Sequence, residues 1–118
     1  MYYKDLEAWK KSVDLVTDIY EITKIFPEDE KFGLVSQMRR ATISIPSNIA
    51  EGSARNSDKE MVRFLDVSLG SIAELETQMI ISQKLGYINQ TDIYEKINST
   101  AALINGLKKY LQNKTKDT

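Results

Sequence analysis

The chain has 118 residues, a net charge of −1, no cysteine and no histidine. This length fits a single domain over residues 1–118, and the lack of cysteine excludes disulfides and thiolate metal sites. The lack of histidine removes the commonest general base and metal ligand, and no stretch approaches the roughly 18 apolar residues of a membrane span. We therefore expect a soluble, cytoplasmic protein without metal, cofactor or small-molecule substrate.

The first predicted helix begins near Asp5, a favourable N-cap residue, and runs to about Ile25. Its apolar residues form two stripes on different sides. One stripe contains Leu6, Trp9, Val13, Val16 and Tyr20, and the other, on the far side, contains Ala8, Leu15 and Ile22. The helix stops at Phe26, because Pro27 disfavours helical angles at the residue before it.

The second predicted helix opens after Pro27, passes through Pro46 and ends between Gly52 and Asn56. One stripe lies within about 40° of a single line on a helical wheel; it contains Leu34, Met38, Ala41, Ile45, Ile49 and Gly52. The stripe keeps its phase across Pro46, which predicts one long helix kinked at the proline. Asn48 and Glu51 flank this kink, and we expect them to bond backbone groups left unpaired there.

The opposite side of this helix also carries apolar residues. It gathers Phe32, Ser36, Ile43, Ser47, Ala50 and Ala54. One interpretation is an ordinary helix with a few exposed apolar residues; the other is a second packing face against another copy of the chain. For the second interpretation the predicted interface contains Leu15, Ile22, Phe32, Ile43 and Ala50.

Two further helices follow short turns. A capping box from Ser57 to Glu60 starts the third, whose main stripe contains Met61, Phe64, Ser68, Ile72, Leu75, Met79 and Ser82. Gly86 ends it, and Asn89 to Thr91 cap the fourth, whose a/d stripe contains Ile93, Ile97, Thr100, Ile104, Leu107 and Leu111. Residues 113–118 have no apolar anchor and are expected to fray. The pattern predicts an all-α, antiparallel up-down-up-down four-helix bundle.

Catalytic and nucleotide-binding motifs are not found. Glu74 and Glu76 are two residues apart on the third helix, so they point in different directions and cannot act as a carboxylate pair. The isolated glycines match neither a P-loop nor a dinucleotide-binding pattern. We expect no enzymatic activity.

Five basic residues are candidates for phosphate contacts: Arg39, Arg40, Arg55, Lys59 and Arg63. The last three follow one line at i, i+4 and i+8, and arginine offers a planar fork to phosphate oxygens. The alternative is that these side chains form ion pairs within the subunit or between subunits. No aromatic stacking platform is expected beside them.

The chain resembles the 23S ribosomal RNA intervening-sequence proteins, small bacterial four-helix proteins related to the accessory protein of diversity-generating retroelements. The resemblance runs nearly end to end. It rests on Asp5-Leu6 with Trp9, Phe26-Pro27, Phe32-Gly-Leu34 with Gln37, Arg39-Arg-Ala41, Ser44-Ile-Pro-Ser-Asn-Ile-Ala-Glu-Gly52, Arg55, Phe64-Leu65, Gly70-Ser71, Glu74-Leu-Glu76 with Gln78, and Leu85-Gly-Tyr87. It implies a homopentameric ring without catalytic residues and, in the retroelement branch, nucleic-acid binding through a basic surface.

Together these features predict a non-enzymatic, oligomeric bundle that binds RNA or DNA weakly and without sequence preference. The alternative is a protein–protein scaffold with no role in nucleic-acid binding. The net charge of −1 favours this alternative, because it offers no general attraction to a polyanion.

Overall fold

The computed structural model of the chain describes residues 1–89 and 92–116. Its α-helices are α1 (Glu7–Thr23), α2 (Leu34–Ser53), α3 (Asp58–Lys84) and α4 (Asp92–Lys116). Short 3-10 turns, η1 (Tyr3–Asp5) and η2 (Glu28–Glu30), precede α1 and α2. Within the described ranges there is no strand, so the prediction of an all-α four-helix bundle is confirmed.

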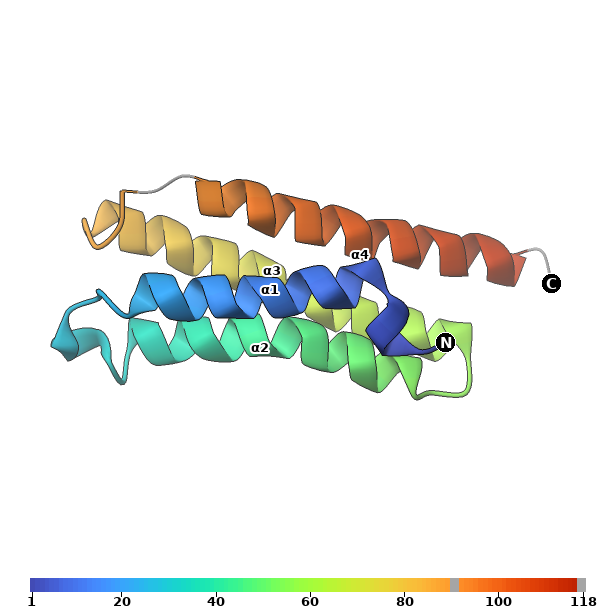
Figure 1. The fold of residues 1–118 in the computed structure, drawn as a ribbon. Coiled ribbons are helices and arrows are strands. Elements are labelled where there is room, and N and C mark those ends of the chain that lie inside the picture. Colours follow the sequence, from blue (N-terminus) through green and yellow to red (C-terminus); the bar gives the residue numbers. More distant parts are fainter. Residues whose placement is uncertain (90–91, 117–118) are drawn as a thin grey trace.

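The four helices lie side by side along one long axis, and successive helices are joined at alternate ends of the molecule (Figure 1). Helices α1 and α3 each pack against both α2 and α4. The molecule measures 52 × 22 × 20 Å. Figure 1 places the start of the chain, the last turn of α4 and the α2–α3 turn at one end of the bundle, and the α1–α2 connection and the end of α3 at the other.

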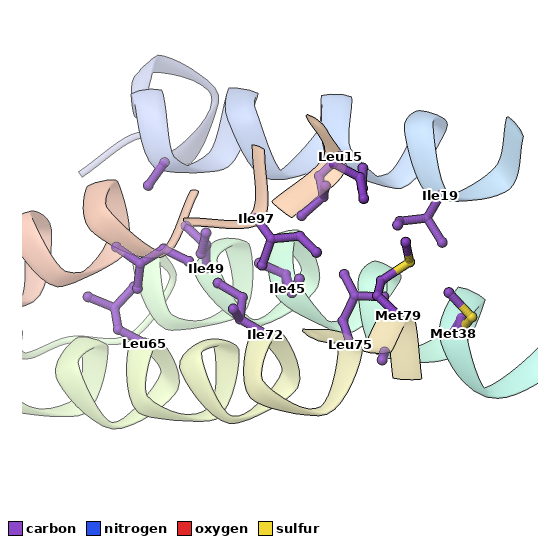
Figure 2. Packing of buried hydrophobic residues seen from close by; sticks show 14 of the residues in the cluster. Leu15, Ile19, Met38, Ile45, Ile49, Leu65, Ile72, Leu75, Met79 and Ile97 are labelled. Carbon is purple, nitrogen blue, oxygen red and sulfur yellow. The ribbon is translucent and has the colours of Figure 1, made fainter. Parts of the chain in front are cut away.

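The core lies along the axis between the helices, and Figure 2 shows side chains from all four helices converging there. The predicted stripe of α2 is largely confirmed, since Met38, Ile45 and Ile49 are fully buried. Gly52 continues this stripe where α2 and α3 approach most closely. A Cβ there would lie 2.7 Å from Cβ of Phe64, so a larger residue would force the helices apart.

The predicted a/d stripe of α4 also faces the core. Five of its members are buried: Ile93, Ile97, Thr100, Ile104 and Leu111. Leu107 is half-buried. Sequence periodicity therefore identified the inward side of α4 correctly.

The predicted Ser57 cap and the predicted glycine at the end of α3 are present, while the Glu60 carboxylate pairs with Arg63. The Ser57 hydroxyl accepts a hydrogen bond from the Glu60 amide at 3.1 Å. At the other end Gly86 has a φ of 81°. The amide of Gly86 donates to the Gln83 carbonyl, and that of Tyr87 donates to the Ser82 carbonyl, each at 3.0 Å. This pair of bonds is a Schellman motif, which needs a left-handed residue that glycine adopts without strain.

The start of α1 differs from the prediction. Asp5 belongs to η1, and the N-cap is Leu6, which makes no side-chain capping bond. The inward side of α1 carries Ala8, Ser12, Leu15, Ile19 and Thr23. Two of these are polar, and their hydroxyls donate to carbonyls of their own helix, Ser12 to Trp9 and Thr23 to Ile19. Apolar spacing alone therefore did not reveal which side of α1 faces the core.

Helix α2 is continuous through Pro46, which is buried. The Asn48 amide donates to the carbonyl of Ser44 at 2.8 Å and to its hydroxyl at 2.9 Å. Glu51 instead pairs with Arg55 at 3.2 Å, so the expectation that its carboxylate bonds the backbone is wrong. The kink at Pro46 stays a prediction.

Helix α4 continues past Asn113 to Lys116. Leu111 is fully buried, and Lys114 pairs with Asp58 of α3 at 3.4 Å, which anchors this last part of the helix. The expected fraying therefore does not begin at Asn113. Residues 117–118, and the proposed cap as far as it involves residues 90–91, lie outside the described residues. No helix in the described part of the chain is long and apolar enough to cross a membrane.

Candidate nucleic-acid and self-assembly surfaces

Arg39 stabilises the end of α1. Its guanidinium lies 4.4 Å from the centre of the Tyr20 ring. Its Nε donates to the Thr23 hydroxyl at 3.0 Å, and its Nη2 donates to the Tyr20 carbonyl at 3.4 Å. Carbonyls in the last turn of a helix lack helical partners, and a cation is favourable there. Arg39 is therefore engaged inside the subunit.

The predicted single line of Arg55, Lys59 and Arg63 is wrong, because Arg55 lies in the turn after α2 while Lys59 and Arg63 lie on α3, and acids pair with both arginines. Arg55 pairs with Glu51 at 3.2 Å, and its guanidinium lies 4.9 Å from the centre of a phenylalanine ring, that of Phe64. Arg63 pairs with Glu60 at 3.4 Å. These are exposed pairs between residues close in sequence, worth at most about 1 kcal/mol each, so a phosphate could compete for the arginines.

Arg40 and Lys59 are different, because both are exposed and neither forms an ion pair within residues 1–89 and 92–116. Arg40 lies about 20 Å of helical rise before Ser53, where α2 ends, and Arg55 follows in the turn. The five basic residues therefore form two separate groups. The sequence spacing shows the second group but does not show which members carry an internal partner.

The predicted interface residues do not share one surface. Leu15 is 1% exposed and lies in the subunit's own core, so its assignment to an interface is wrong. Phe32 is 89% exposed and Ile43 is 42% exposed, while Ile22 and Ala50 are half-buried. Phe32 and Ile43 thus present apolar surface to the outside.

Helix α3 adds exposed apolar residues that the predicted interface did not include: Val67, Ile80 and Ile81. Val67 and Ile81 are fourteen residues apart, about 40° from each other around the helix, so they lie on one side. We call Phe32, Ile43, Val67 and Ile81 the outer apolar residues. Helices α2 and α3, which carry three of them, pack directly together.

The seam between α1 and α4 contains two cavities of about 550 and 340 Å³. Both are lined by Asp18 and Lys96, whose side chains form an ion pair across the seam at 3.2 Å. Ile22 and Ile25 line the larger cavity. The described residues place no group of histidine, cysteine and acidic side chains suited to hold a metal ion there or elsewhere.

Tyr87 joins the two connections at one end of the bundle. Its hydroxyl donates to Oε2 of Glu30 at 2.9 Å, and its ring lies 5.3 Å from the centre of the Phe26 ring. The hydrogen bond to Glu30 raises the pKa of the Tyr87 hydroxyl, and burial and the charges of Glu30 and Asp29 raise it further. We interpret this contact as structural and not as part of an acid–base pair, because a neutral phenol beside a carboxylate is a poor proton donor at neutral pH.

Residues 4–109 match the family model described as 23S rRNA-intervening sequence protein. The chain belongs to this family. The resemblance read from the sequence is confirmed to that extent, while the relation to retroelement accessory proteins stays a prediction.

One solved structure shows the same fold as this member of the 23S rRNA-intervening sequence protein family. It comes from Bacteroides thetaiotaomicron VPI-5482 and is described as a protein with unknown function from the S23 ribosomal protein family. The two chains are 23% identical with a TM-score of 0.64, and the match covers 88% of this chain and 94% of that chain. A comparison with curated proteins finds no match.

Proposed function

We propose that this 23S rRNA-intervening sequence protein is a non-enzymatic subunit of a homo-oligomer. The observation that carries the proposal is the set of outer apolar residues, above all Phe32, which is 89% exposed. Large apolar side chains exposed on the outside of a bundle become favourable when another protein covers them. The lack of histidine and cysteine supports a role without catalysis. The ring of five subunits rests on the family resemblance.

The proposal is tested by the mass of the purified protein in solution, measured by light scattering at several concentrations. We expect a mass several times the 13.5 kDa of one chain, and about five times if the ring is a pentamer. An Ile43→Asp variant should dissociate while keeping its helical circular dichroism, because a charge in an interface core is costly.

Ile25→Asp is the matched control, since Ile25 is 70% exposed but is not one of the outer apolar residues. It should leave the mass unchanged. A wild-type mass of 13.5 kDa at all concentrations would overturn the proposal.

A second candidate function is weak binding of RNA or DNA. The observation that favours it is that Arg40 and Lys59 are exposed and free of ion pairs within the described ranges. Such side chains can contact phosphate without first breaking an internal pair. Repetition of both groups around an oligomer would multiply a small number of contacts per subunit.

This candidate is tested by the affinity for a structured RNA across a salt series starting at about 50 mM. An Arg40→Ala, Lys59→Ala double variant should bind more weakly and with a smaller salt slope. The control is a Lys24→Ala, Arg63→Ala double variant, which removes two paired cations and should lose less. Failure of the wild type to bind at the lowest salt would favour the scaffold without a nucleic-acid role.

A further inference from the structure

Three aromatic side chains at the start of the chain form a continuous contact. The ring centres of Tyr2 and Tyr3 are 5.6 Å apart, and those of Tyr3 and Trp9 are 5.3 Å apart in an edge-to-face arrangement. We call these residues the aromatic ladder. Sequence periodicity did not indicate this cluster, which forms because η1 brings Tyr3 against Trp9.

The backbone holds the ladder in place. The Asp5 amide donates to the Tyr2 carbonyl at 3.1 Å, and the Leu6 amide donates to the Tyr3 carbonyl at 3.0 Å. Trp9 is partly buried and packs against the hydrophobic core. The inner two rings are thus anchored by the fold, whereas Tyr2 at the outer end is 58% exposed. An exposed ring backed by ordered rings costs little entropy to use in binding.

Polar and cationic groups lie beside this segment. Segment η1 packs against α2, and Figure 1 places it at the same end of the bundle as the α2–α3 turn. A cavity of about 190 Å³ there is lined by Met1 and by Arg55, Asn56 and Ser57 of the turn. Asp58 also lines it, and its carboxylate pairs with Lys114 at 3.4 Å. Lys4, next to the ladder in sequence, is exposed and forms no ion pair within the described part of the chain.

We propose that the aromatic ladder is a stacking site for an unpaired base of a single-stranded nucleic acid, with an adjacent phosphate held by Arg55 and the α2–α3 turn. Exposed aromatic rings beside cations are the means by which proteins bind single strands without sequence preference. Bases inside a duplex are stacked on each other and cannot present their faces to Tyr2. This inference rests on the nucleic-acid candidate above and is independent of self-assembly.

The chain contains a single tryptophan, Trp9, so its fluorescence reports on the ladder directly. The experiment titrates the full chain with a single-stranded oligouridylate of about twelve nucleotides and with an abasic strand of the same length and charge. We expect the oligouridylate to quench Trp9 and to bind about 5- to 100-fold more tightly than the abasic strand.

Variants assign the effect to the ladder. Tyr2→Ala should reduce affinity for the oligouridylate to the level of the abasic strand, and Tyr2→Phe should keep it, because stacking needs the ring and not the hydroxyl. Tyr110→Ala is the matched control, since Tyr110 is 59% exposed but lies outside the ladder. Circular dichroism checks that each variant is folded.

The outcomes separate the two levels of the proposal. Equal binding of both strands, or unchanged affinity in Tyr2→Ala, would overturn the stacking site while leaving the phosphate contacts intact. No binding of either strand would overturn both the stacking site and the nucleic-acid candidate. The oligomer mass, measured in parallel, is not expected to change in any of these variants.

Discussion

Buried hydroxyl groups determine which sides of the helices face inward. Ser12, Ser68 and Ser82 are fully buried, and each donates to a carbonyl, of Trp9, Ile45 and Gln78 respectively. A small side chain with a satisfied hydroxyl lets two helices approach closely at little cost. Ser68 and Ser82 were included in the predicted stripe of α3, but Ser12 was in neither predicted stripe of α1, which explains why Leu15 was placed on the wrong side of α1.

For charged residues too, the sequence does not show which side chains make contacts with other helices. Arg39 and Arg40 are adjacent and chemically identical, yet one caps the end of α1 and the other is exposed. The difference comes from the position of Tyr20 and Thr23 on a neighbouring helix. Tertiary contacts of this kind leave no local signal in the sequence. The candidate basic residues could therefore be named from the sequence, but not which of them contact groups within their own subunit.

The Tyr87–Glu30 contact should make stability depend on alkaline pH. Because the pKa of Tyr87 is raised in the folded protein, the contribution of this tyrosine is complete below its unfolded pKa and is lost as pH rises through the folded value. Tyr87→Phe removes the hydrogen bond but keeps the ring beside Phe26. We expect this variant to melt at a lower temperature than the wild type at about pH 8, with the difference shrinking above about pH 10.

Thermal unfolding followed by circular dichroism at several pH values, at one fixed protein concentration, measures this difference. The control is Tyr110→Phe, because Tyr110 is exposed, lies on α4 and is not part of the Glu30 contact. A constant gap between Tyr87→Phe and wild type from neutral to alkaline pH would contradict the account.

At the level of elements, explicit local signals were predicted well. The Ser57 cap and the left-handed Gly86 were both read correctly, because each depends on residues within one turn of the chain. The start of α1 was not, because η1 takes up Asp5 and shifts the N-cap to Leu6. A 3-10 turn stabilised by the packing of Tyr3 on Trp9 depends on contacts beyond the cap sequence.

Pro46 lies inside α2 and is expected to affect the shape and stability of this helix. It removes the amide that would bond the Thr42 carbonyl, and the buried hydroxyl of Thr42 has no hydrogen-bond partner among the described residues. Proline inside a helix costs about 3 kcal/mol and commonly bends it. We expect Pro46→Ala to straighten α2, which should raise the melting temperature of the isolated subunit and change the assembly of subunits if the kink shapes the interface.

Melting temperature and oligomer mass are measured together for Pro46→Ala. The matched control is Gln37→Ala, at an exposed position of the same helix outside the predicted packing face, which should alter neither quantity. If both quantities are also unchanged in Pro46→Ala, the kink is incidental to stability and assembly.

In the molecule as a whole, the four helices are not packed equally closely against their neighbours. Helices α2 and α3 meet along a close seam where Gly52 contacts Phe64, the hydroxyl groups of Ser44 and Ser71 are 2.8 Å apart, and Ser68 bonds the Ile45 carbonyl. The α1–α4 seam instead contains the cavities of about 550 and 340 Å³ and is crossed by the Asp18–Lys96 pair. An exposed ion pair of this kind contributes at most about 1 kcal/mol, so α4 should be the helix that separates most easily.

Hydrogen exchange followed by mass spectrometry tests this order on the assembled protein. We expect amides of α4 to exchange faster than those in the middle of α2 and α3, because local opening occurs first where few buried contacts must be broken. Lys96→Ala should lower the free energy of unfolding by less than about 1 kcal/mol. Ile97→Ala removes a fully buried side chain and should lower it by roughly 2–5 kcal/mol. Equal protection of α2 and α4 would mean that the cavities along α1 and α4 are closed in solution, either by the subunit itself or by a neighbouring copy. Comparison of exchange above and below the concentration at which the oligomer dissociates then separates these two causes, because a neighbouring copy protects α4 only in the assembled state.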